Sequence, residues 1–151
     1  MITIYHKRDL ERHTAGAVFH ATPYINYNSI VESGGISPNT KFERKSLFGN
    51  TENGYFRQRG CVSFFDYRDY GSPEWQQHAY KCTPTQILCR AESIVLLILC
   101  ASQFSKLISW RQWKEDEAWS QRVVPHVEAG YPGQVSLRYI TEVLYIDQAY
   151  S

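Results

Sequence analysis

The sequence lacks the features of a membrane, secreted or strongly charged protein. Its longest apolar run, residues 94–101, is far shorter than the roughly 20 residues that span a bilayer. The first residues, Met1 to Arg8, lack the apolar core of a signal peptide. Sixteen basic and 15 acidic side chains leave a net charge of +1, which argues against binding nucleic acid through a broad basic surface. We therefore expect a cytoplasmic protein with no membrane partner.

Metal-binding and common catalytic motifs are also missing. The four cysteines are not spaced C-x-x-C and none lies beside a histidine at ligand spacing, so we expect free thiols and no metal: Cys61, Cys82, Cys89 and Cys100. There is no P-loop, no G-x-G-x-x-G, no H-E-x-x-H and no G-x-S-x-G. Nucleotide binding through a glycine-rich loop and the familiar hydrolase mechanisms therefore find no support.

What the chain does have is a length of 151 residues, no internal repeat and many aromatic residues, among them 11 tyrosines. This length fits one domain with its own core. A tyrosine ring with a polar tip suits a core and a wet groove equally. Composition alone leaves that choice open.

The first half of the chain predicts two strands and two helices. Residues 15–20 resemble a short strand, and a helix is expected to follow at once, with Thr22 as its N-cap and Gly34 as its left-handed end. Residues 61–65 favour a strand, and Ser72 is typical of a helix start. Between them, residues 37–60 are predicted to form a long, basic, functional loop.

The second half predicts a buried central strand and a mixed C-terminal part. Residues 92–100 are a continuous apolar run, expected to be a strand buried on both faces. A helix capped by Ser102 is expected to extend through Trp110. Further expected elements are a strand at 123–127, a turn at 130–133, a helical turn at 137–140 and a strand at 142–146. Strands and helices do not alternate regularly, which favours an α+β fold.

Three segments together resemble NAD-using ADP-ribosyltransferases, including the DNA-modifying DarT toxins. They are residues 17–36, with His20-Ala21-Thr22 before a helix that ends in Gly-Gly-Ile; residues 59–66; and residues 122–146. The resemblance implies one ADP-ribosyltransferase-like domain with a split antiparallel sheet, flanking helices and an NAD cleft covered by the 37–60 loop. It implies transfer of ADP-ribose from NAD to a macromolecule, nucleic acid or protein.

The resemblance also points to site residues. Cleavage of a glycosidic bond develops positive charge on the sugar, which a carboxylate stabilises, and Glu128 at the end of the 123–127 strand suits this role. The small residues Ala129 and Gly130 are expected to let a ligand approach the backbone. His126 stands where the family often has Glu or Gln, and is a candidate base. Glu142 and Glu92 are weaker candidates for the carboxylate.

The remaining candidates would bind the NAD itself. His20 is expected to hydrogen-bond a ribose hydroxyl, Thr22 to donate to a phosphate, and Arg59, or alternatively Arg57, to contact the diphosphate. Ser63 is expected to support the nicotinamide pocket. Tyrosines beside the cleft are expected to stack on nicotinamide or adenine: Tyr24, Tyr27, Tyr55, Tyr67 and Tyr131.

Two other functions remain open. The same scaffold is used by NAD-dependent RNA 2′-phosphotransferases, although those normally carry more basic residues. Alternatively, the domain is a non-enzymatic binding protein of the immunity or antitoxin type, whose aromatic surface docks another protein. A transferase toxin would in turn be expected to have an antitoxin or immunity protein as its partner.

Overall fold

The computed structural model describes residues 1–39 and 54–151, which form short helices around a large sheet. In chain order, with η for a short 3-10 helix, the elements are β1 (Ile2–Thr3), α1 (Lys7–Thr14), β2 (Val18–Pro23), η1 (Tyr24–Asn26), α2 (Tyr27–Ser33), β3 (Gly35–Ile36), α3 (Tyr55–Gln58), β4 (Cys61–Asp66), α4 (Pro73–Ala79), η2 (Gln86–Cys89), β5 (Ser93–Leu99), η3 (Ala101–Lys106), β6 (Ile108–Ser109), α5 (Trp110–Glu115), β7 (Glu128–Pro132), β8 (Val135–Ser136), η4 (Leu137–Tyr139) and β9 (Ile140–Asp147). Within these described residues, no helix is long and apolar enough to cross a membrane.

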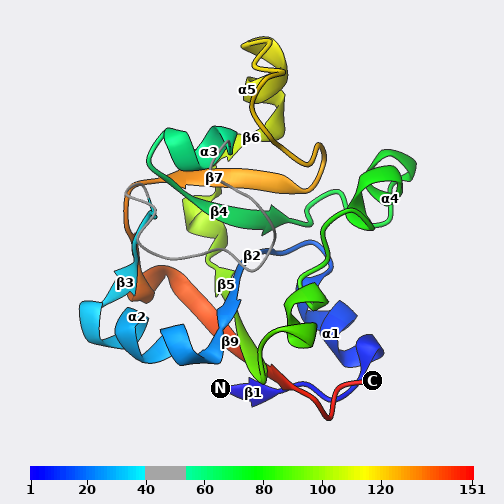
Figure 1. Ribbon diagram of the computed structural model, residues 1–151, viewed down its shortest axis with the longest axis vertical. Coiled ribbons are helices and arrows are strands. Elements are labelled where there is room, and N and C mark those ends of the chain that lie inside the picture. The colour runs from blue at the N-terminus through cyan, green and yellow to red at the C-terminus, as the bar shows by residue number, and fades with distance from the viewer. Residues whose placement is uncertain (40–53) are drawn as a thin grey trace.

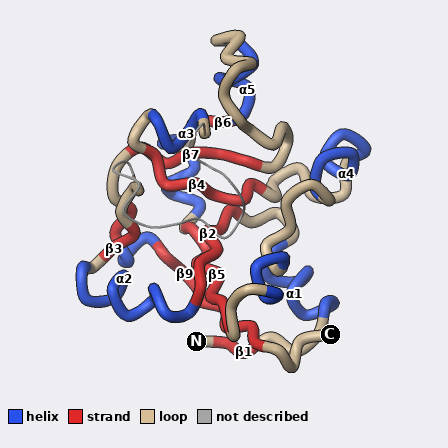
Figure 2. Tube along the Cα trace, in the orientation of Figure 1, coloured by secondary structure: helices blue, strands red, loops and turns tan. Residues whose placement is uncertain are grey.

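Seven of the strands form one sheet in the order β1-β9-β5-β2-β4-β7-β6, and β3 pairs with β8 in a small second sheet (Figure 2). All pairs in the large sheet are antiparallel except β1 with β9. The predicted α+β class with a mostly antiparallel sheet is therefore confirmed.

Strand β5 is the centre of the core, as its apolar run predicted. Its side chains alternate between two apolar clusters on opposite faces of the sheet. Ile94, Leu96 and Ile98 pack in the cluster that includes Leu10 of α1. Val95, Leu97 and Leu99 pack in the cluster that includes Ile30 of α2. A strand buried on both faces needs no polar alternation, which is why the run is continuous.

The large sheet opens between the neighbouring strands β2 and β4. Strand β2 pairs with β5 from Phe19 to Pro23, but with β4 only at Val18 and Phe19. Beyond Phe19, β4 instead follows β7, to which it is paired from Cys61 to Phe65. Figure 1 shows β4 and β7 running across the direction of β2, β5 and β9. This divergence leaves one edge of β2 and one edge of β4 facing a gap in the sheet.

Several predicted boundaries are confirmed because they depend on local chemistry. The Ser72 hydroxyl oxygen accepts a hydrogen bond from the Trp75 amide at 3.2 Å and caps α4. Gly34 ends α2 with a φ of 79°, a conformation that glycine adopts without steric cost. The strands at 61–65 and 142–146 and the helical turn at 137–140 are present, with bounds that differ by a few residues.

Two predicted helix starts are wrong. Thr22 does not cap a helix: it belongs to β2 and pairs with Val95, and its hydroxyl oxygen accepts from Nδ2 of the Asn26 side chain at 3.2 Å instead. The helix expected from Ser102 through Trp110 is broken into η3, β6 and α5, and Ser109 caps α5 through the Arg111 amide. In both places sheet pairing overrides a local helix signal.

The strand predicted at 123–127 is also wrong. These residues form an irregular segment and a turn, and β7 begins only at Glu128, where pairing with β4 begins. Glu128 therefore starts a strand rather than ending one. The turn expected at 130–133 begins later than predicted. Residues up to Pro132 belong to β7, and the chain turns at Gly133, which has a φ of 78°.

The predicted loop at 37–60 contains the short helix α3 near its end. Its residues 40–53, which include most of the basic stretch, lie outside the described residues. The residues on either side of this stretch, Asn39 and Gly54, both line a cavity between β2 and β4.

Candidate functional site

A cavity of about 500 Å³ lies where β2 and β4 diverge. Its wall is built from both edges of the split, the two described ends of the 37–60 segment, and the approach to β7. Cavities of this size hold small molecules and cofactors. The residues that carry polar groups or aromatic rings into it include His20, Thr22, Asn26, Asn39, Phe56, Arg57, Ser63, Phe64, Phe65, Lys81, Arg122 and Glu128.

His20 bridges the split. It sits on β2 opposite Leu97 of β5, and its Nδ1 lies 2.8 Å from the carbonyl oxygen of Ser63 on β4. Because a carbonyl only accepts, Nδ1 carries the proton and donates. The ring also lies edge-on to Phe64, with centroids 5.8 Å apart. His20 is thus held by two contacts to β4 at a point where the two strands no longer pair.

Glu128 lies in the cavity wall at the start of β7 and is partly exposed. One of its carboxylate oxygens, Oε1, accepts a hydrogen bond from the Val124 amide at 2.9 Å. Burial raises the pKa of Glu128 to about 7, although the Val124 hydrogen bond and the charge of Arg122 act in the opposite direction. A carboxyl group that titrates near neutrality in a cavity is a typical feature of a functional site. The sequence predicted this residue, although on a different backbone element.

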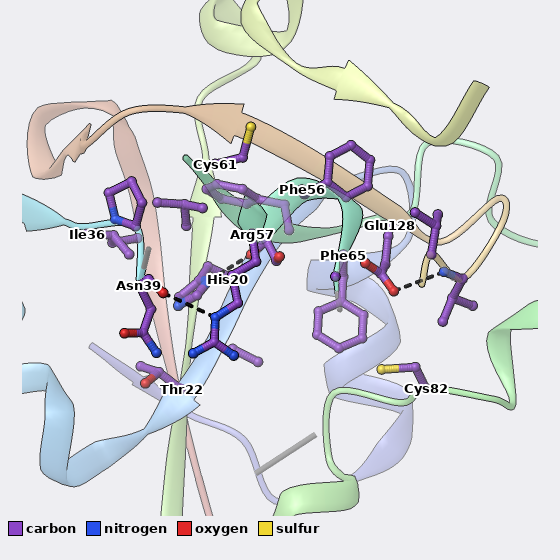
Figure 3. Close-up of a pocket in the computed structure, with 18 of the residues that line it drawn as sticks. His20, Thr22, Ile36, Asn39, Phe56, Arg57, Cys61, Phe65, Cys82 and Glu128 are labelled. Atoms are coloured by element: carbon purple, nitrogen blue, oxygen red, sulfur yellow. Dashed lines mark hydrogen bonds between the residues drawn. The ribbon is translucent and has the colours of Figure 1, made fainter. Parts of the chain in front are cut away.

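The two strongest candidates lie on either side of one aromatic ring. In the view of Figure 3, the Phe65 ring projects between His20 and Glu128. Phe65 is the strand partner of Glu128 and stacks on Phe19, with ring centroids 5.2 Å apart. In this view Phe65 separates the part of the wall near His20 from the part near Glu128.

Of the two arginines predicted from the sequence to contact the diphosphate, Arg57 lines the cavity, together with Lys81 and Arg122. Arg57 donates from Nε to the Asn39 carbonyl at 3.1 Å, and Figure 3 shows its guanidinium beside Asn39, on the His20 side of Phe65. Arg59 lies outside the lining. Its guanidinium is 3.5 Å from the centroid of the Tyr55 ring and donates to Gln121 at 2.9 Å.

The structure brings together His20, Thr22, Ser63 and Glu128 on one cavity and leaves out His126 and Tyr27. His126 is not among the lining residues, and its ring packs against Trp110 with centroids 4.1 Å apart and planes tilted by 41°. Tyr27 packs against the apolar cluster around Ile30. Their predicted roles in contact with substrate therefore have no geometric support among the described residues.

The rings that line the cavity are phenylalanines rather than the expected tyrosines. Phe56, Phe64 and Phe65 contribute to the wall, whereas none of the five tyrosines does. Three of those tyrosines are buried in the core: Tyr55, Tyr67 and Tyr131. Phe64 and Phe65 are neighbours in β4, so strand geometry directs their side chains to opposite faces of the sheet. The sequence does not reveal which face borders a cavity.

Gly130 serves packing rather than ligand approach. A Cβ at this position would lie 2.4 Å from Cδ1 of Phe56, so the space above its backbone is already filled by that ring. The expectation that Ala129 and Gly130 leave room for a ligand is corrected accordingly. Gly130 instead lets Phe56, which is 1% exposed, lie flat on β7 and form part of the cavity wall.

Two cysteines and a lysine that the sequence did not single out also line the cavity. Burial and the nearby Glu128 charge raise the pKa of Cys82 to about 12, and burial raises the pKa of Cys61. Both thiols are therefore protonated and poorly nucleophilic at neutral pH. Lys81 precedes Cys82 and donates from Nζ to Nδ1 of His78 at 2.9 Å. The described part of the chain holds no cluster of three metal-ligating side chains.

Comparison of the chain with family models, curated proteins and solved structures found no match. The geometry and chemistry of the cavity are therefore the basis for a functional assignment.

Proposed function

We propose that the protein is an ADP-ribosyltransferase that takes ADP-ribose from NAD and attaches it to a macromolecule, nucleic acid or protein. The observation that carries this proposal is the split between β2 and β4, because it forms one cavity lined by His20, Ser63 and Glu128. These residues were predicted from three separate segments of the sequence. That all three line one cavity supports a common role.

The lining residues suit the parts of a dinucleotide. Arg57 offers a guanidinium for a diphosphate, which it is well shaped to bind. His20 offers an imidazole for a ribose hydroxyl, and the phenylalanine rings offer apolar faces for a nicotinamide or adenine ring. Arg57 thus offers a positive charge for the anionic diphosphate. Glu128 offers a carboxylate for the ribose, which becomes cationic during the reaction.

The chemistry follows from the charge of Glu128. When the bond between nicotinamide and ribose breaks, both electrons leave with nicotinamide and positive charge develops on the ribose. An ionised Glu128 stabilises that charge from a site where water screens little. The acceptor then bonds to the ribose carbon and releases a proton to solvent or to Glu128. Because the Glu128 pKa is about 7, transfer should become faster as the pH rises from 6 to 8.

The first test measures NAD binding and nicotinamide release by wild type and His20→Ala. Loss of one hydrogen bond to ribose should weaken NAD binding about tenfold, since it removes about 1 kcal/mol or slightly more. His6→Ala is the matched control, because His6 is an exposed histidine before α1 and outside the cavity. Wild type that neither binds NAD nor releases nicotinamide would refute the proposed function.

The second test separates the two arginines. Arg57→Ala should weaken NAD binding by about 10- to 100-fold, because a hydrogen bond to a charged group is worth about 1.5–3 kcal/mol. Arg59→Ala should leave NAD affinity within about twofold even if it lowers stability, because its guanidinium contacts Tyr55 and Gln121 instead. Isothermal titration calorimetry with NAD measures both. Equal losses for the two variants would contradict the assignment of Arg57 to the diphosphate.

A further inference from the structure

Three aromatic rings from different parts of the chain pack beside the start of β7, in a cluster that we call the ring stack. The His126 ring is stacked on His78 of α4, with centroids 5.5 Å apart and planes within 19°, and is tilted by 41° against Trp110 of α5, with centroids 4.1 Å apart. In Figure 1, α4 and α5 lie on different sides of the segment that enters β7. The stack therefore fastens that segment to both helices.

The segment so fastened is the turn that holds the Glu128 carboxylate. The Val124 carbonyl accepts from the amides of Val127 and Glu128 at 3.2 and 3.0 Å, and the Val124 amide donates to Glu128 Oε1. His126 sits inside this turn with a φ of 63°, which a residue other than glycine seldom adopts. Such a conformation persists only where surrounding contacts hold it, and the ring stack supplies them.

We propose that His126 is a positioning residue for Glu128, and that protonation of His78 releases the Val124–Glu128 turn through the contact between the His78 and His126 rings. This deepens the proposed function, and rests on it in treating Glu128 as the acting carboxylate. His126 thereby receives a role that acts through the backbone, without touching substrate.

The charged groups around the ring stack determine whether it opens at low or at high pH. Lys81 faces His78, Arg111 lies over Trp110 and contacts Asp69 at 3.9 Å, and Glu128 lies at the start of β7 with its carboxylate turned to Val124. Arg122 is near enough to Glu128 to affect its pKa. A proton on His78 would meet Lys81 and a second histidine.

Protonation also removes a contact. At neutral pH, Nδ1 of His78 accepts from Lys81, and a protonated Nδ1 cannot accept. Burial, Lys81 and His126 lower the pKa of His78. A lowered pKa in the folded state means that stability is lost as the pH falls below about 6.5 toward that folded value. Acid should therefore loosen the stack, whereas neutral and alkaline pH should keep it closed.

Hydrogen exchange of the Val124 and Val127 amides tests this without NAD. After correction for intrinsic rates, wild type should lose protection at these two amides between pH 7.5 and pH 5. The amides of Leu96 and Leu97 in β5 serve as the internal control and should keep their protection. Equal protection of the turn at both pH values would overturn the proton response.

Two substitutions separate the proton on His78 from the ring of His126. His78→Phe keeps an aromatic ring beside His126 but cannot take up a proton, so the turn should respond less to acid than in wild type. His126→Asn tolerates the left-handed backbone but removes the ring. In His126→Asn, opening of the turn should lower the Glu128 pKa, because relief of burial, the larger effect, outweighs the loss of the Val124 hydrogen bond. Carboxyl NMR follows this titration. An unchanged Glu128 titration would overturn the positioning role.

Failure of this proposal and failure of the proposed function are distinguishable. A turn that responds as described in a protein that never cleaves NAD would overturn only the transferase assignment. Nicotinamide release by a wild-type protein whose turn is insensitive to pH and to His126→Asn would overturn only the role of the stack.

Discussion

Glu128→Gln is expected to slow nicotinamide release by at least about 100-fold while NAD affinity changes little. Loss of one preorganised charge that acts on the transition state typically costs that much, whereas the isosteric amide preserves shape and still accepts from the Val124 amide. The measurement is single-turnover release of nicotinamide at pH 8. Glu92→Gln, at an exposed position, is the matched control. Wild-type activity in Glu128→Gln would remove this carboxylate from the chemistry.

The same substitution should stabilise the fold at alkaline pH. The Glu128 pKa is raised from 4.5 to about 7, so its contribution to stability is fully present below pH 4.5 and is lost as the pH rises through 7. The neutral glutamine avoids that loss, which amounts to at most about 3 kcal/mol at pH 8. Urea unfolding from pH 5 to pH 8 measures the difference, which should grow with pH. A difference that stays constant would show that Glu128 is not buried as described.

The combination of these two effects is informative. A residue that costs stability in its ionised form and yet improves activity fits a functional site, because an ordinary core position would gain from being neutral or apolar. A Glu128→Gln variant that gains stability without losing activity would instead show that the Glu128 carboxylate has no part in the reaction.

Gly130→Ala is the substitution expected to damage the fold most. Its Cβ would lie 2.4 Å from Cδ1 and 2.9 Å from Cγ of Phe56, and 3.0 Å from Cβ of Cys61. Overpacking of this kind costs about 1–3 kcal/mol, and we expect the upper end of that range because the Phe56 ring is buried and lies directly against Gly130. Thermal and urea unfolding measure the loss. Gly71→Ala, where a Cβ meets nothing within 4 Å and only the φ of 84° is unfavourable, should cost about 1 kcal/mol.

A double substitution checks the cause. If the clash with Phe56 is responsible, Gly130→Ala combined with Phe56→Ala should destabilise by clearly less than the sum of the two single effects. Additive losses would show that the backbone at Gly130, rather than the ring above it, is what the substitution disturbs. Because Phe56 forms part of the cavity wall, Gly130→Ala should also weaken NAD binding in whatever fraction remains folded.

The sequence by itself determined the features whose cause is local. The continuous apolar run defined β5 because a strand covered on both faces needs no polar positions. Ser72 and Gly34 marked helix ends because a hydroxyl cap and a left-handed glycine act within a few residues. His20, Ser63 and Glu128 were also named from the sequence, through a family resemblance and the residue types that the chemistry needs.

Only the tertiary structure decided what depends on strand pairing. Thr22 lies in β2 because Val95 is opposite it, although its local surroundings favour a helix cap. Residues 123–127 do not form a strand, because pairing with β4 begins only at Glu128. The choice of Arg57 over Arg59, and the stacking of His126 away from the cavity, depend on contacts with residues far away in the chain. Side-chain direction at these positions is set by partners that no local pattern contains, whereas caps, turns and buried runs contain their own cause.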